Sequence, residues 1–229
     1  MPEFGYELAL DLAAVWTRVG TFGLREDPWR RLERPEGLAE VGYWDSSEFD
    51  PLAFDPLMPN CAFANCTDRD GYWAAKIISA FTDEQLAAIC DEARYADPRA
   101  APYVARVLAE RRDIIAREFF GRVPPLDFFA WSGDRLTFRD LGEERGVYPG
   151  TSPRYRMRLA DLDADGHAAR RTGWIVRDTP AVDAALAGED VAADGFLQVA
   201  CRVDRGDGWS REIRATFSRR THAVVRVER

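Results

Sequence analysis

The sequence is poor in lysine, histidine and cysteine, and these shortages limit the metal chemistry open to it. Lys76 is the only lysine among 31 basic residues, and the 229-residue chain has two histidines and four cysteines. A structural zinc site needs four close ligands. Cys61 and Cys66, spaced C-x4-C, are the only close cysteine pair. Buried thiols explain the cysteines better than a metal site does, and we expect no zinc centre.

The chain also lacks a positive net charge and a long apolar run. Its formal charge is −8, which disfavours nucleic-acid binding because that requires a basic stripe. No stretch approaches the roughly 18 apolar residues of a membrane span. Residues 1–5 lack the basic and apolar regions of a signal peptide. We therefore expect no nucleic-acid partner, no membrane span and, by default, a cytoplasmic location, while the oligomeric state stays open.

The common signatures of catalysis are missing as well. There is no G-x-S-x-G elbow, phosphate-binding loop, G-x-G-x-x-G or H-E-x-x-H motif. His167 and His222 both fall in the C-terminal part, without a serine context for a triad. These absences favour a chain that is not an enzyme by itself, although a mechanism based on aspartate or glutamate would leave no local signature.

What is present predicts a folded α+β protein. Hydrophobic residues make up 46% and aromatic residues 12% of the chain, enough for a core. Residues 1–66 are predicted to form an irregular arm, rich in aromatic residues and proline, that packs on a helical domain at residues 67–150. Residues 151–229 are predicted to form a small antiparallel β-sandwich.

The helices are predicted from capping signals and apolar periodicity. Thr67 with Asp70, and Thr82 with Gln85, are spaced as capping boxes, predicting helices over 68–80 and 83–94. A third helix is predicted over 98–120, after the aspartate and proline at 97–98. In the arm, a strand leading into a helix is predicted over 10–19. The aromatic side chains of residues 43–54 are expected to lie on the helical block.

From residue 153 onwards the apolar period changes to two. Tyr155, Met157 and Leu159 alternate with arginines, and four further strands are predicted around residues 175, 199, 215 and 225. Residues 126–150 are predicted to cross over between the domains, with their aromatic side chains beneath the helices. Two interpretations of the outward arginines stay open, an anion-binding surface and a solvated face; these arginines are Arg156, Arg158, Arg202, Arg214 and Arg226.

A candidate ligand-binding site surrounds the start of the first helix. Its oxygen donors suit Ca²⁺ or Mg²⁺, and its lysine suits an anion; the residues are Asn60, Asn65, Asp68, Asp70, Trp73 and Lys76. Helix capping by the two aspartates is the competing interpretation, with Trp73 and Ile77 explained by packing. We expect Lys76 to be buried against Asp or Asn oxygens, locking the arm to the helices.

A second metal candidate is the first half of a calcium loop. Asp161, Asp163 and Asp165, followed by Gly166, match the spacing of three converging oxygen ligands and a sharp turn. The twelfth position is Thr172 where a bidentate glutamate is needed. An aspartate-rich hairpin turn is therefore the preferred interpretation.

Several segments resemble a family of bacterial proteins to which no activity is assigned. The shared pattern is P-N-x-A-F at residues 59–63 followed by D-G-Y-W-A-A-K-I at 70–77. It continues at 81–85, 95–98, 111–115 and 124–127, so it covers roughly the first 130 residues, with a looser likeness in the terminal strands. The family has proline where Cys61 stands, which argues against a metal role for Cys61.

Longer members of this family carry an upstream region with an Asp-Phe-Gly-like strand that suggests a remote kinase-like fold. The resemblance therefore implies that this chain corresponds to the C-terminal part of such a protein. A complete phosphotransferase needs a glycine-rich loop, a catalytic loop and metal-binding residues, which these 229 residues lack. The resemblance carries over no catalytic residue.

Three functional hypotheses follow. The first is a non-catalytic module that binds a partner protein or ligand, or scaffolds a larger assembly. The second is a fragment of a kinase-like or metal-dependent enzyme whose site is completed by an upstream segment. The third is a β-domain stabilised by calcium.

Overall fold

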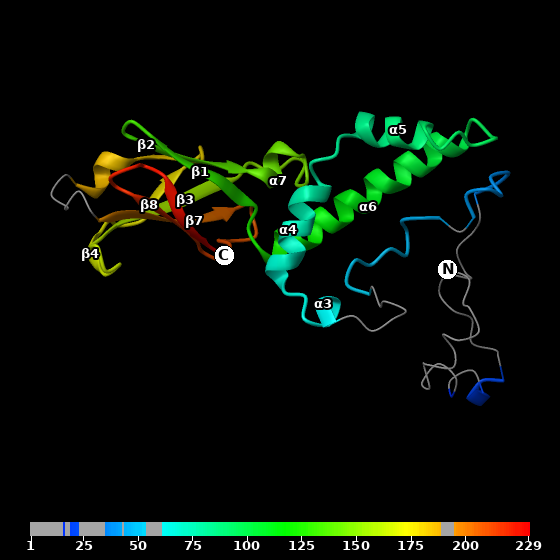
Figure 1. The fold of residues 1–229 in the computed structure, drawn as a ribbon, viewed down its shortest axis with the longest axis horizontal. Helices are drawn as coiled ribbons and strands as arrows, with labels where there is room; N and C mark the ends of the chain where they lie inside the picture. The colour runs from blue at the N-terminus through cyan, green and yellow to red at the C-terminus, as the bar shows by residue number, and fades with distance from the viewer. Residues whose placement is uncertain (1–15, 17–18, 23–34, 43, 54–60, 189–194) are drawn as a thin grey trace. The chain divides into compact units, whose positions relative to one another are not determined.

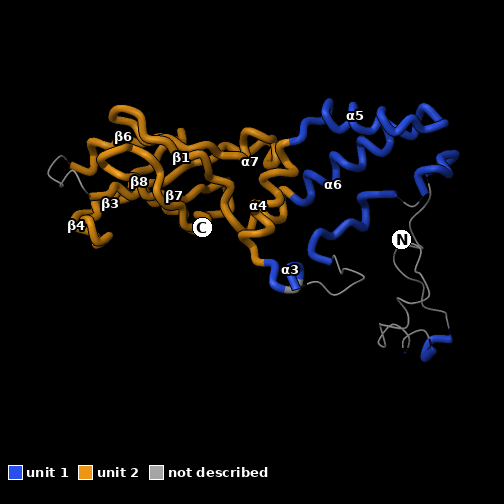
Figure 2. Tube along the Cα trace, in the orientation of Figure 1, with its two compact units in different colours: residues 1–66, 81–115 blue, residues 67–80, 116–229 orange. Residues whose placement is uncertain are grey.

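The computed structural model describes residues 16, 19–22, 35–42, 44–53, 61–188 and 195–229. The fold is α+β, as the sequence predicts. It consists of two compact units, residues 1–66 with 81–115 and residues 67–80 with 116–229 (Figure 2). The boundaries between these units therefore differ from the predicted domain boundary at residue 150. The predicted strand and helix at 10–19, the aromatic residues Tyr43 and Phe54, and Asn60 lie wholly or mainly outside the described residues.

The first unit contains helices α3 (Cys61–Ala64) and α5 (Asp83–Asp91) and most of α6 (Ala100–Arg122). The described part of the arm contacts α6. The Tyr103 hydroxyl donates to the Trp44 carbonyl at 2.9 Å, and the Arg111 guanidinium lies 3.9 Å from the centre of the Trp44 ring and 4.8 Å from that of Phe49. These contacts confirm, for residues 44–49, that the arm lies on a helix.

Two helices begin at the predicted capping boxes. In α4 (Asp68–Ile78), which belongs to the second unit, the Thr67 side chain accepts from the Asp70 amide and the Asp70 carboxylate accepts from the Thr67 amide. Thr82 and Gln85 do the same for α5. Both pairs satisfy amides that a helix start otherwise leaves without partners.

The second unit contains two antiparallel sheets (Figure 1). The three-stranded sheet has the order β1-β2-β6, and the six-stranded sheet has the order β4-β3-β7-β8-β9, with β5 pairing β3. The bounds are β1 (Leu126–Ser132), β2 (Arg135–Asp140), α7 (Leu141–Glu144), β3 (Arg154–Leu162), β4 (Ala168–Arg171), β5 (Ile175–Arg177), β6 (Ala181–Asp183), η2 (Ala184–Ala187), β7 (Phe196–Asp204), β8 (Ile213–Ser218) and β9 (Val224–Glu228).

The core of this unit lies between the two sheets. Alternate residues of β3, β7 and β8 are fully buried, as the period of two predicts. Phe138 of β2 packs edge-on against Tyr155 of β3 at 5.5 Å, and Trp131 of β1 packs edge-on against Phe217 of β8 at 6.1 Å. These ring contacts join the sheets into the predicted sandwich.

The crossover predicted for residues 126–150 is wrong, because β1, β2 and α7 occupy most of it. The pairing register shifts between Asp127 and Ala130, and Phe128 has a φ of 50°. This irregularity breaks the alternation that identifies a strand in the sequence. The Phe129 and Phe138 rings pack at a tilt of 35° inside the sandwich, with their centres 5.4 Å apart, and Phe128 is 48% exposed.

Gly71 lies where α4 meets α6. A Cβ at this position would lie 2.0 Å from a ring atom of Phe119. Helix propensity alone favours alanine by about 1 kcal/mol, but the clash forces the ring or the helix to move, at a typical cost of about 1–3 kcal/mol. We predict that Gly71→Ala lowers the free energy of unfolding, measured by urea denaturation.

Gly121 provides the matched control. It lies in α6, is exposed, and has no atom within 4 Å of an added Cβ. Gly121→Ala should therefore raise the free energy of unfolding by about 0.5–1 kcal/mol. Equal effects of the two substitutions would contradict the proposed contact with Phe119.

Candidate functional site

Five of the six predicted ligand-binding residues lie among the described residues. Asn60 lies outside the described residues. Asn65 belongs to the first unit, where its side-chain amide donates to the Cys61 carbonyl at 2.7 Å. No disulfide joins Cys61 and Cys66, since each of the four cysteines, all of them described, is a thiol. The remaining predicted residues lie on α4.

On α4, both aspartates already have side-chain or backbone partners. The Asp70 carboxylate caps the helix, and hydrogen bonds from the Thr67 hydroxyl and amide lower the pKa of Asp70 below its ordinary value. The Asp68 carboxylate lies 3.1 Å from a guanidinium nitrogen of Arg122. Trp73 is 65% exposed and Ile77 is 45% exposed, so the explanation of these two residues by packing is wrong.

Lys76 has a carboxylate partner on β1. Its Nζ lies 2.6 Å from an Asp127 oxygen, and the side chains are 29% and 12% exposed. Asp127 also lies 2.8 Å from a guanidinium nitrogen of Arg229 and accepts from the Tyr72 hydroxyl at 3.0 Å. Lys76 is thus paired with an aspartate oxygen, as expected, but this pair joins α4 to β1, and the predicted lock between arm and helices is not what it forms. Arg229 joins the same cluster through Asp127.

Three cation–π contacts extend this cluster. The Arg229 guanidinium lies 4.5 Å from the centre of the Tyr72 ring. On the outside, Phe128 is flanked by Lys76 at 4.5 Å and Arg139 at 4.8 Å. A positive φ is costly for a bulky residue, and here it turns the Phe128 ring toward two cations.

The protonation states indicate a structural role for this cluster. Burial tends to raise the pKa of Asp127, but the hydrogen bond from Lys76 and the charge of Arg229 outweigh it, and the pKa lies below the ordinary value of 3.8. Burial raises the pKa of the Tyr72 phenol, so it stays a hydrogen-bond donor. An ionised aspartate whose oxygens already accept from three side chains is poorly suited to proton transfer.

The outer face of the six-stranded sheet carries alternating arginines, as the sequence predicts. The structure adds two tryptophans from the loops. We define the arginine–tryptophan face as Arg154, Arg156, Arg158, Arg202, Arg214 and Arg226 with Trp174 and Trp209. The arginines occupy the strand positions that alternate with the buried residues, because successive residues of a strand point to opposite faces of the sheet.

Arg156 lies at the centre of this face. Its guanidinium carbon is 4.8 Å from the centre of the Trp174 ring and 4.7 Å from that of Trp209. Arg156 pairs directly with Arg202 of β7, an arrangement of like charges that destabilises a sheet. The Nε atoms of both arginines are buried and have no hydrogen-bond partner within the described residues.

Few acidic side chains balance the face. Glu212 serves three of its arginines, at 2.6 Å from Arg214, 3.4 Å from Arg202 and 3.7 Å from Arg158. Asp204 pairs with Arg154 and Glu228 with Arg226. Six arginines against three carboxylates leave a net charge of +3, on a chain whose total is −8.

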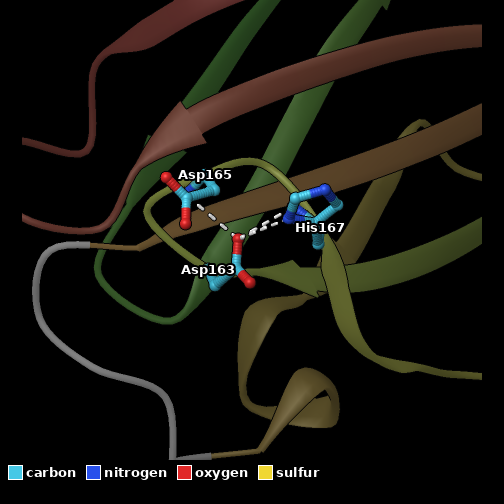
Figure 3. A group of neighbouring side chains, drawn as sticks. All are labelled: Asp163, Asp165 and His167. Carbon is cyan, nitrogen blue, oxygen red and sulfur yellow. Dashed lines mark hydrogen bonds and ion pairs between the residues drawn. The ribbon is translucent and has the colours of Figure 1, made fainter.

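The calcium half-loop does not assemble around its three predicted ligands. Asp161 lies in β3, is 1% exposed and forms an ion pair with Arg219. Asp163 and Asp165 lie in the exposed hairpin turn, together with His167 (Figure 3). One Asp163 oxygen accepts from the backbone amides of residues 165 and 167. These are the hydrogen bonds of a tight turn, so we derive no metal centre from this cluster.

Comparison with protein-family models, with curated proteins and with solved structures finds no match for this chain. The residue pattern that resembles a bacterial family therefore stays a prediction. Among the described residues, no helix is both long and apolar enough to cross a membrane.

The Asp127 cluster can be tested by removing its charge. Asp127→Asn would leave Lys76 and Arg229 without their shared carboxylate, and breaking such a partly buried pair costs about 3 kcal/mol. We predict a loss of this size in the free energy of unfolding at neutral pH, measured by urea denaturation. Glu144→Gln is the control, because it breaks the more exposed pair with Arg139 and should cost less than about 1 kcal/mol.

The effect of Asp127→Asn on the free energy of unfolding should depend on pH. A carboxyl group whose pKa is lower in the folded state stabilises the fold above its unfolded pKa, and this stabilisation is lost as the pH falls through the folded pKa. The difference in unfolding free energy between wild type and Asp127→Asn should therefore be largest at neutral pH and shrink below about pH 4. A difference that stays constant across urea titrations down to pH 2 would rule out this role of Asp127.

Proposed function

We propose that this chain is a non-catalytic module that binds an acidic segment of a partner protein on the arginine–tryptophan face. The observation that carries the proposal is the pair Arg156 and Arg202. These two like charges lie directly opposite each other, and their Nε atoms have no hydrogen-bond partner among the described residues. Arg156 contacts two tryptophan rings, and Arg202 contacts one of them. An acidic ligand would supply the negative charge and the acceptors that this arrangement lacks.

Ordinary solvation explains this face less well. Arg156 and Arg202 are only partly exposed, and burial together with the charge of Arg202 lowers the pKa of Arg156 below its ordinary value. A solvated surface arginine would extend into water and avoid a like charge. The tryptophan rings instead hold the guanidinium groups in place, which reduces the entropy lost when a ligand binds.

The chemistry of the face favours carboxylates as ligands. A guanidinium group binds a carboxylate through two parallel hydrogen bonds, and its flat faces stack on tryptophan. A nucleic acid would also offer anions, but it would be repelled by a chain with a net charge of −8. An acidic polypeptide can place a few carboxylates on the cationic face and direct the rest of its surface elsewhere.

Both histidines of the chain lie among the described residues of the second unit. His167 lies beside Asp163 in the exposed turn, and His222 stacks on Trp131 at 4.0 Å. Neither side chain has a serine or cysteine partner in the described part of the chain. No specific observation favours the kinase-like or calcium-stabilised alternatives over the binding module.

The test is a binding titration with a short fluorescent peptide of alternating Asp and Glu. We expect Arg156→Gln combined with Arg202→Gln to weaken binding by about tenfold, the equivalent of 1.4 kcal/mol. Binding to the wild type should also weaken as salt is added. Fluorescence anisotropy at two salt concentrations measures both effects.

The matched control removes the same charge elsewhere. Arg94 and Arg220 are exposed, and their side chains make no hydrogen bond or ion pair with other described residues. The double variant Arg94→Gln and Arg220→Gln should bind the peptide like the wild type. Equal losses in both double variants would show a non-specific charge effect, and tighter binding of single-stranded DNA than of the peptide would contradict a protein partner.

A further inference from the structure

A second cationic site lies in a pocket of the same unit. The pocket has a volume of about 420 Å³, within the range of roughly 300–1,000 Å³ typical of small-molecule sites. The start of α4, the end of α6, the residues around the start of β8, and residue 229 form its walls. The lining residues are Thr67, Asp68, Arg69, Arg122, Val123, Pro124, Arg211, Ile213 and Arg229.

Four arginines and one aspartate make up the charged lining. Two of these arginines are already bound to carboxylates. Arg122 lies 2.6 Å from Glu118 and 3.1 Å from Asp68. The Arg229 guanidinium is held by Asp127 and by the Leu126 carbonyl. These two side chains therefore form fixed parts of the wall.

The other two arginines have unused donors. Arg69 donates through Nε and a terminal nitrogen to the backbone oxygen of Arg229, at 3.0 and 2.6 Å, and has no side-chain carboxylate partner in the described part of the chain. Arg211 is exposed, and its side chain has neither a hydrogen bond nor an ion pair with any described residue. Both border the same cavity.

We propose that this pocket binds the phosphate group of a small phosphomonoester. A phosphate dianion matches two guanidinium groups that have no side-chain carboxylate partner among the described residues, and it offers enough acceptors for both. Val123, Pro124 and Ile213 supply an apolar wall for the organic part of the ligand. The site is separate from the arginine–tryptophan face, so either proposal can fail without the other.

Asp68 allows a substitution whose effect on phosphate affinity should be opposite to that of removing an arginine. It is the only acidic side chain in the lining, and its charge opposes an incoming phosphate. Arg211→Gln should weaken binding about tenfold, as expected for a lost hydrogen bond to a charged group. Asp68→Asn should strengthen binding about threefold, the size expected of an exposed charge interaction.

The measurement is calorimetric titration of the full chain with phenyl phosphate and with inorganic phosphate. The double variant Arg156→Gln and Arg202→Gln is the control, because it changes arginines of the same unit outside the pocket, and it should bind phosphate like the wild type. Urea denaturation of each variant confirms that it is folded.

Three results would overturn the proposal. The first is no heat of binding by the wild type at millimolar phosphate. The second is unchanged affinity in Arg211→Gln and in Asp68→Asn. The third is loss of binding in the control double variant, which would place the anion on the arginine–tryptophan face.

Discussion

The carboxylate of Asp127 is the interaction on which the second unit depends. It lies at the start of β1 and receives Lys76 from α4, Tyr72 from the same helix, and Arg229 from the residue after β9. Three parts of the chain that are far apart in the sequence are thereby held at one charged group. Because a charge with few water contacts is costly unless it is well paired, the helix and the terminal strand are both needed for Asp127 to be stable.

The same use of aspartate recurs at two other positions in the sandwich. Buried Asp140 accepts two hydrogen bonds from one Arg205 nitrogen and one from the Tyr155 hydroxyl. Buried Asp161 pairs with Arg219. In each case the arginine is the first residue after a strand, Arg205 after β7 and Arg219 after β8. A planar guanidinium with five donors suits such pairs better than lysine does, so part of the arginine content has a structural explanation.

Local patterns in the sequence predicted local structure, and contacts between distant residues were not predictable. The capping boxes at Thr67 and Thr82 and the alternation of β3 involve neighbouring residues, so they predicted the helix starts and the buried strand face. The bulge at Phe128 breaks the alternation, which hid β1. The partner of Lys76 depends on the packing of α4 on β1, which no local pattern encodes. Asp161 is separated from Asp163 and Asp165 because β3 ends at Leu162, leaving the first aspartate inside the sheet and the others in the turn.

The arginines without adequate carboxylate partners argue for binding more strongly than the number of arginines does. A chain with 39 acidic residues against 31 basic ones could pair every arginine, and the second unit pairs its buried ones closely. Arg156 on the sheet face is an exception, because it is partly buried and has no carboxylate partner among the described residues. The pocket adds two exposed arginines, Arg69 and Arg211, that have no side-chain carboxylate partner in the described part of the chain and lie beside an apolar wall. The face is broad and partly exposed, so it suits a polypeptide and rapid, salt-dependent association. The pocket is concave and has an apolar wall, so it suits a small anion whose shape as well as its charge is recognised.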